Sequence, residues 1–117
     1  PRWAETEDVL TMLPDLAAIV CINLLHISPW DASEALFAEA GRRLPAGGVL
    51  VVYGPFRRHG EHTAPSNAAF DADLRSRDPR WGVRDLETVE ALAGDNGLTC
   101  EAIRELPANN LCVVWRR

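Results

Sequence analysis

Two apolar runs stand out in the pattern of hydrophobic and polar positions, one over residues 17–25 that contains a single polar residue, Asn23, and an unbroken one over residues 49–53. Both runs are rich in β-branched residues, and both are shorter than an ordinary helix. The second run lies between Gly48 and the pair Gly54-Pro55, residue types that interrupt regular structure. Runs of this kind are typical of strands buried on both faces, as in a parallel sheet covered by helices. The pattern therefore predicts two buried strands.

Between these runs the pattern is helical. Asp31 and Glu34 have the spacing of a capping box, with the aspartate in the cap position. Apolar residues then recur close to every 3.6 positions until Pro45 and two glycines make continuation of the helix costly. Helix, tight turn and buried strand form half of a βαβ unit, and ligands bind such sheets at the carboxyl ends of the strands. The expected inward positions are Ala32, Leu36, Phe37, Ala40 and Leu44.

The last third of the chain predicts a helix followed by a hairpin. Asp85 can cap the helix, and Asn96-Gly97 can stop it in a left-handed conformation. Strands are then expected over residues 99–106 and 111–115. Because only a short turn separates them, these two strands must be antiparallel neighbours.

Two stretches carry weaker patterns. Thr6 can cap a short helix that ends at Pro14. Residues 57–84 are the least regular part of the chain, with room for one helical stretch over residues 70–76. A long irregular excursion from the carboxyl end of a strand is often a lid or a substrate loop. We expect this loop to be held down near its end, with Trp81 buried.

The composition limits the class of protein. A chain of 117 residues builds one domain with one core, and 47% hydrophobic with 25% charged residues is ordinary for a soluble globular protein. The net charge of −5 argues against a nucleic-acid surface. The longest apolar stretch, residues 16–27, is too short to span a bilayer, and no basic segment precedes it as in a signal peptide. We expect a cytoplasmic protein with no membrane partner and, since the chain begins at Pro1, a fragment.

The cysteine and histidine spacings predict neither disulfides nor a metal site. Cys21, Cys100 and Cys112 are odd in number, lie in apolar strand-like runs and show no C-x-x-C spacing. Buried free thiols in a reducing compartment are therefore expected. His59 and His62 have H-x-x-H spacing, but this spacing is common by chance, so we expect no metal.

The order of expected elements resembles the C-terminal half of class I S-adenosylmethionine-dependent methyltransferases, whose sheet ends in an antiparallel hairpin. The segment 44–52 contains a helix-Leu-x-x-Gly-Gly-strand element that is widespread in that superfamily. Five longer strings look like the family that includes methyltransferase-like protein 26, and the likeness runs from about Leu16 to Arg117. These strings are Cys21–Ile27, Tyr53–Phe56, Pro65–Asn67, Arg80–Asp85 and Pro107–Asn110.

The resemblance implies an α/β fold, namely a partial Rossmann-like class I methyltransferase fold with parallel strands, helices and a C-terminal antiparallel β-hairpin. Residues 1–117 would form the carboxyl half of a single methyltransferase-like domain. Such enzymes hold the cofactor mainly with a Gly-rich loop after the first strand and an acidic residue ending the second. The chain contains no G-x-G, and its first expected strand corresponds to the fourth strand of that fold. The implied function is methyl transfer from S-adenosylmethionine to an unknown, small-molecule acceptor, by a chain that lacks the main cofactor-binding loop.

The resemblance also implies a site at the end of the first run. Asn23 and Leu24 would face the methionine part of the cofactor, and His26 is the candidate catalytic base. Methyl transfer from a sulfonium is an in-line displacement, so a base is needed only if the acceptor must lose a proton. The alternative is that Asn23 and His26 satisfy backbone groups where the strand ends.

Five further residues are candidates for contact with the acceptor. Aromatic residues at the exit of the second run could form a pocket wall, although aromatic residues at strand ends more often belong to the core. Polar residues in the loop could orient a polar acceptor, and local turn chemistry explains them equally well. Asn109 and Asn110 suit a turn with unusual φ, and we assign them to structure first. The candidates are Tyr53, Phe56, Ser66, Asn67 and Phe70.

Two other functions remain open from the sequence. A truncated relative could be a non-catalytic interaction module that self-associates through an exposed sheet edge. A different nucleotide-binding α/β enzyme, such as an oxidoreductase, is disfavoured because the chain has no dinucleotide-binding glycine fingerprint.

Overall fold

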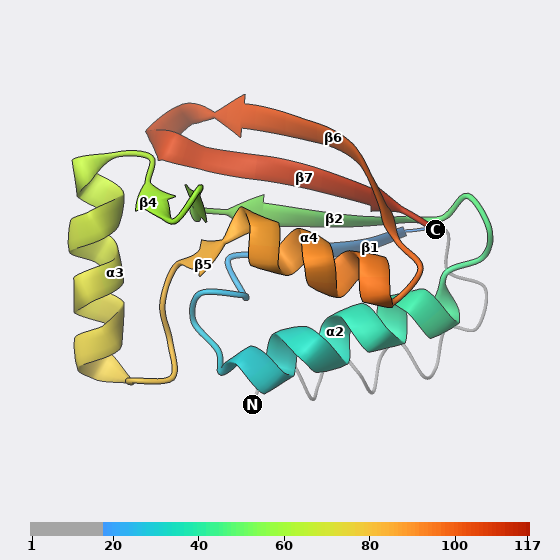
Figure 1. Cartoon of the computed structure of the whole chain (residues 1–117), viewed down its shortest axis with the longest axis horizontal. Coiled ribbons are helices and arrows are strands. Elements are labelled where there is room, and N and C mark those ends of the chain that lie inside the picture. Colours follow the sequence, from blue (N-terminus) through green and yellow to red (C-terminus); the bar gives the residue numbers. More distant parts are fainter. Residues whose placement is uncertain (1–17) are drawn as a thin grey trace.

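The computed structural model describes residues 18–117, and the helix expected after Thr6 lies outside them (Figure 1). The main sheet has four strands in the order β1-β2-β7-β6. Its strands are β1 (Ala18–Ile22), β2 (Val49–Gly54), β6 (Thr99–Leu106) and β7 (Asn110–Arg116).

Strand pairing confirms both topological expectations. β1 and β2 are parallel neighbours, in a register that places Ala18 opposite Val49 and Ile22 opposite Tyr53. β7 runs antiparallel to β2 and to β6, so the chain ends in the expected hairpin. This mixed α/β sheet confirms the predicted fold class.

Helices α2 (Trp30–Arg43) and α4 (Leu86–Asp95) lie against the same face of the sheet (Figure 1). The side of α2 predicted to point inward is buried, and Phe37 meets Trp115 of β7 edge to face, with ring centroids 5.3 Å apart. Both aromatic side chains have no exposed surface. The core therefore lies between this helical layer and one face of the sheet.

The helix boundaries correct two details. α2 begins at Trp30 after Pro29, so Asp31 lies in the first turn and does not cap the helix. Asp85 is the N-cap residue of α4, but its side chain makes no capping bond and lies 3.3 Å from Arg57 instead. The expected stop of α4 is confirmed, because Gly97 has a φ of 77° and the next residue donates its N–H back into the last turn.

The other face of β1 is open, which contradicts the expectation of a strand buried on both faces. Val20 and Ile22 are 62% and 64% exposed, whereas Ile19 and Cys21 face the core. In residues 18–117, helices α2 and α4 both pack on the other face of the sheet, the face of Ile19 and Cys21 (Figure 1). The strand is also shorter than the apolar run, since Asn23 leaves it with a φ of 54°.

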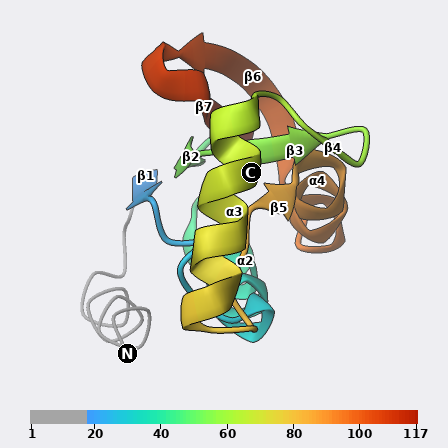
Figure 2. The ribbon, with the colours of Figure 1, turned by 90° about the vertical axis from the view of Figure 1, so that its left-hand side faces the viewer.

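Residues 57–84, expected to be irregular, contain helix α3 (Pro65–Arg77), one short strand and parts of two others. Pro65 occupies the first helical turn, where a proline is compatible with the helix. Figure 2 shows α3 standing across one end of the main sheet. Trp81 is only half-buried, whereas Val83 is buried. A second sheet has the order β4-β3-β5, formed by β3 (Phe56–Arg58), β4 (Glu61–His62) and β5 (Arg84–Asp85).

The three thiols are free, but they differ in environment. Cys21 is buried, Cys112 is half-buried and Cys100 is exposed. The prediction of buried thiols is therefore wrong for Cys100, because it lies on β6, an edge strand that is mostly exposed. Among residues 18–117 no helix is long and apolar enough to cross a membrane.

Candidate functional site

A cavity of about 530 Å³ lies where the parallel strands β1 and β2 end. Its walls come from the loop after β1, the residue after β2, the first half of α3 and the turn between β6 and β7. In open α/β sheets this end of the strands is where ligands bind. The lining residues are Asn23, His26, Ile27, Pro55, Ser66, Asn67, Phe70, Ala108, Asn109 and Asn110.

His26 is the most buried titratable group of this cavity, with 4% of its surface exposed. Burial, with a smaller contribution from the positive charge of Arg84, lowers the pKa of His26 to about 4. The imidazole is therefore neutral at physiological pH. It meets the ring of Phe70 edge to face, with centroids 5.6 Å apart.

Asn23 turns the chain out of β1 into the cavity. Its backbone N–H donates to the Tyr53 carbonyl across the parallel pair at 2.9 Å, and its φ of 54° is in the left-handed region that asparagine tolerates. Gly54 leaves room for this turn. A Cβ on Gly54 would lie 3.3 Å from His26 Cε1 and 3.6 Å from Asn23 Oδ1. The end of β2 therefore packs directly against the two candidate side chains.

Asn67 fastens α3 to the hairpin turn. Its Nδ2 donates to the carbonyl of Asn109 at 3.1 Å and to Thr63 Oγ1 at 3.2 Å. Ala108 and Asn109 have φ values of 63° and 59°, so the turn uses the left-handed conformation at both positions. Asn110 has an extended φ of −95° and donates to the Tyr53 hydroxyl at 3.2 Å. Unusual φ was expected for Asn109 and Asn110, and only Asn109 has it.

The structure brings together five of the eight residues that the sequence nominates. Asn23, His26, Ser66, Asn67 and Phe70 all line the cavity, although their roles stay predictions. Leu24 packs against the core, Tyr53 points its hydroxyl at Asn110, and Phe56 is only 2% exposed. These three side chains do not line the cavity.

Other lining residues carried no functional signal in the sequence. Pro55 and Ile27 belong to the nominated strings but have no reactive side chain, and Ala108 lines the cavity only because the turn folds back over β2. Asn109 and Asn110 were noted for their turn chemistry alone. Their closeness to α3 depends on a contact over 42 residues of sequence, which no local pattern reveals.

None of the lining residues carries a formal charge at neutral pH, because His26 is neutral and the others are amides, a hydroxyl or apolar groups. Amide donors and acceptors beside an aromatic edge suit an uncharged, planar, hydrogen-bonding ligand. The ammonium and carboxylate of S-adenosylmethionine find no ionic partner here. The lining therefore suits an uncharged group and not a charged one.

The histidines of the H-x-x-H pair lie apart from this cavity. His62 on β4 places Nε2 3.4 Å from a carboxylate oxygen of Asp71, while the backbone N–H of His59 donates to Glu87 at 2.8 Å. In the described part of the chain no three His, Cys, Asp or Glu side chains group as a metal site would require.

Solved structures, several of them named as methyltransferases, have the same fold. The pyocyanin biosynthetic protein PhzM is 22% identical with a TM-score of 0.74, over 94% of this chain and 33% of PhzM. An O-methyltransferase family 2 protein from Planctomyces limnophilus, in complex with apigenin, is 21% identical with a TM-score of 0.77, over 90% of this chain and 32% of its own. Human N-acetylserotonin methyltransferase, in complex with SAM, is 12% identical with a TM-score of 0.78, over 90% of this chain and 30% of its own.

The sheet order, the terminal hairpin and these likenesses define the fold of class I S-adenosylmethionine-dependent methyltransferases. The chain spans about a third of the length of the solved structures that it matches. It belongs to the family DUF938, "Protein of unknown function (DUF938)", whose model matches residues 2–117.

Proposed function

We propose that this chain is the acceptor-binding part of an S-adenosylmethionine-dependent methyltransferase, with an uncharged small molecule bound in the cavity beside His26. The observation that supports this most directly is the position of the cavity. It lies at the carboxyl ends of β1 and β2, in a chain with the methyltransferase fold. The finer likeness to the family of methyltransferase-like protein 26 is part of this proposal.

Bound S-adenosylmethionine would supply an electrophilic methyl group on its sulfonium. The residues present contribute positioning, since an in-line displacement depends on the alignment of the two reacting atoms. The amides of Asn23 and Asn110 and the edge of Phe70 would fix an acceptor in the cavity. In this proposal Asn23 also approaches the cofactor, whose charged groups are held by residues other than those lining the cavity.

His26 has the free-base form that a proton acceptor needs, since the pKa of its imidazole is about 4. A base of such low pKa is weak, however, and catalytic bases work best with a pKa near the working pH. We therefore assign His26 first to accepting a hydrogen bond from the hydroxyl or N–H of the acceptor. Removal of the acceptor proton is its second role.

Calorimetric titration tests the cofactor part of the proposal. S-adenosylmethionine and S-adenosylhomocysteine are titrated into the 117-residue chain and, where the gene encodes more residues, into the longer chain. We expect the longer chain to bind more tightly, because the cavity lacks ionic partners for the methionine end. Failure of both chains to bind either compound contradicts the proposal.

Turnover tests the role of His26. A small-molecule cell extract serves as the acceptor source. Formation of S-adenosylhomocysteine is followed with whichever chain, the 117-residue chain or the longer one, binds S-adenosylmethionine in the titration. His26→Gln should lower this rate about 10²-fold if the imidazole removes a proton, and by less if it only orients the acceptor. The matched control is His59→Gln, because His59 is an exposed loop histidine. Equal rates in both variants contradict any role of His26.

A second candidate function rests on β1. Within residues 18–117 this strand pairs only with β2, and it presents Val20 and Ile22 to solvent. An open sheet edge beside exposed apolar side chains favours strand pairing with another chain. We propose a second copy as the partner, and sedimentation velocity over a range of concentrations tests it. A monomer at every concentration contradicts self-association and leaves the methyltransferase proposal untouched.

A further inference from the structure

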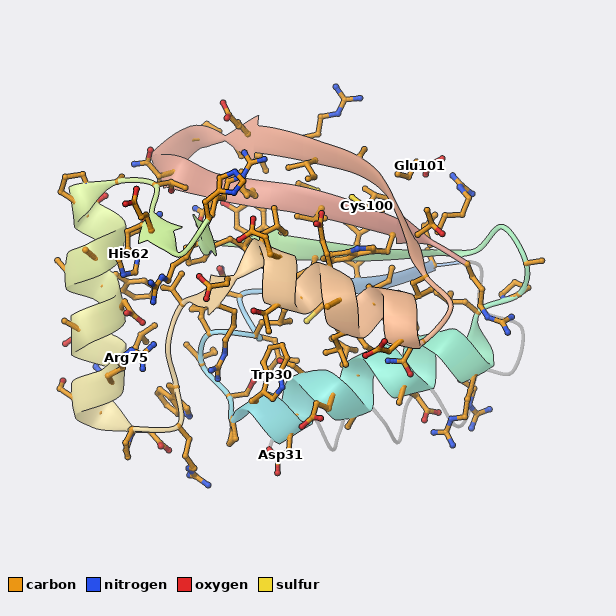
Figure 3. The ribbon with its side chains drawn as sticks, in the orientation of Figure 1. Trp30, Asp31, His62, Arg75, Cys100 and Glu101 are labelled. Carbon is orange, nitrogen blue, oxygen red and sulfur yellow. The ribbon has the colours of Figure 1, made fainter. Side chains whose placement is uncertain are left out.

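A second cavity, of about 280 Å³, lies between α3, β5 and the start of α4. It shares no lining residue with the cavity beside His26. Three guanidinium groups line it, those of Arg57, Arg75 and Arg84, together with the side chains of Asp85 and Thr88. In Figure 3, Arg75 projects from α3 on the side where Trp30 lies at the start of α2.

The guanidinium of Arg84 has no carboxylate partner among residues 18–117. Its Nε donates to the Leu25 carbonyl at 3.1 Å, and its Nη2 donates to the carbonyls of Ser28 and Arg80, each at 2.8 Å. Burial, and then the positive charge of Arg75, lowers the pKa of Arg84. A half-buried cation thus donates hydrogen bonds to neutral carbonyls and lies near a second cation, and the charge of Asp71 is a smaller, stabilising influence on it.

The other two arginines are only partly neutralised. Arg75 donates through Nε to the carboxylate of Asp71, at 3.1 and 3.2 Å, and no terminal N–H of Arg75 has an acceptor within the described residues. Arg57 lies 3.3 Å from Asp85. Asp71 is not among the lining residues, although it also accepts the backbone N–H of Val83 at the cavity wall. Three arginines are thus accompanied by two carboxylates, of which only that of Asp85 lines the cavity.

The start of α4 lies at the same cavity, and the acidic residue of its first turn, Glu87, accepts the backbone N–H of His59. Its N-cap residue, Asp85, makes no side-chain capping bond, so the first backbone N–H groups of this ten-residue helix have no side-chain partner there. Thr88, in the first turn, lines the cavity with its side chain. Helix N-termini and arginine side chains are the groups that bind phosphate and carboxylate oxygens in proteins.

We propose that this cavity is an oxyanion site that binds the phosphate or carboxylate group of a ligand. The terminal N–H groups of Arg75, the Nη1 group of Arg84, the Thr88 hydroxyl and the first turn of α4 are its donors, since Nε and Nη2 of Arg84 already donate to backbone carbonyls. The oxyanion supplies the counter-charge that Arg84 lacks. The site is independent of the methyltransferase proposal, because the two cavities are lined by different residues.

Inorganic phosphate and acetate are the probes, each titrated into the ¹⁵N-labelled 117-residue chain while backbone amide shifts are recorded. Sodium chloride at matched ionic strength is the reference. We expect saturable shifts centred on the Thr88 and Val89 amides. Saturation by phosphate alone identifies a phosphate site, and saturation by acetate as well identifies a site for oxyanions in general.

Arg75→Gln should raise the dissociation constant about tenfold, because it removes charge-assisted donors. Arg77→Gln is the matched control, since Arg77 lies on the same helix in an i,i+4 pair with Asp73 but does not line the cavity. Thr88→Val is a second variant that tests the site if Arg75→Gln does not fold. An adventitious ion only, shown by chloride giving the same shifts, overturns the proposal. The absence of saturable shifts also overturns it. So does an equal rise of the dissociation constant in Arg75→Gln and Arg77→Gln.

Discussion

The two cavities beside α3 differ in the charge of the residues that line them. The cavity beside His26 is lined by amides, apolar groups and a neutral imidazole, whereas the cavity beside Thr88 gathers three arginines around one carboxylate. α3 separates them, because Ser66, Asn67 and Phe70 face the first cavity and Arg75 faces the second.

Arg84 connects the two regions physically. Its donors hold the carbonyls of Leu25 and Ser28, so it anchors the loop that carries His26. Its charge also contributes to the low pKa of His26, after burial. The positive charge of Arg84 thus helps to keep the imidazole of His26 neutral. The neutrality of the cavity beside His26 therefore depends partly on Arg84, a side chain that does not line it.

The largest effect is expected from pH. The pKa of His26 in the folded chain is about 4, below the ordinary value of 6.5, so the unfolded chain takes up a proton first as the pH falls. The contribution of the neutral His26 to the free energy of unfolding is fully present above pH 6.5 and is lost as the pH falls from 6.5 to 4, by about 3 kcal/mol. Urea unfolding at several pH values measures it.

His26→Gln should remove this part of the pH dependence, and the control His59→Gln should retain it. Other acids also titrate in this window, so the difference between the two variants is the quantity to compare. Identical pH profiles for both variants contradict a neutral, buried His26 and, with it, the contrast between the cavities.

A smaller effect is expected from Arg84→Met. The substitution leaves the carbonyls of Leu25 and Ser28 without their donor, which should cost about 2 kcal/mol of unfolding free energy. It also removes a positive charge near His26, so the pKa of His26, read from its imidazole NMR signals, should rise from about 4. Arg77→Met should change neither quantity, since Arg77 is exposed on the far part of α3. If the pKa of His26 is the same in Arg84→Met as in the unsubstituted chain, the two cavities are not coupled through Arg84.

The smallest effect is expected from Asn67→Ala. Loss of the bonds to Asn109 and Thr63 should lower the free energy of unfolding by about 1 kcal/mol, measured by urea denaturation. Ser66→Ala is the neighbouring control, because Ser66 is exposed and lines the same cavity. If both substitutions have the same effect, Asn67 does not fasten α3 to the hairpin turn.

Local patterns were sufficient for the elements of the main sheet. Both apolar runs became adjacent parallel strands, and the short turn before Leu111 made the final hairpin antiparallel. Asn23 and His26 follow the first of these strands, and they were nominated through the resemblance to methyltransferases, in agreement with the rule that ligands bind at the carboxyl ends of strands. Helix α3 was underestimated, because its apolar side is narrow and only Leu74 among its aliphatic residues is fully buried.

What the sequence by itself determined is therefore the order of elements, the direction of their pairing and the nomination of the strand-end residues. These depend on periodicity and on the steric limits of glycine and proline, which act over a few neighbouring residues. Only the tertiary structure decided that one face of β1 is open, that Phe56 belongs to the core and that three distant arginines share a cavity. Burial and net electrostatic potential are sums over groups far apart in the chain, so no local pattern contains them.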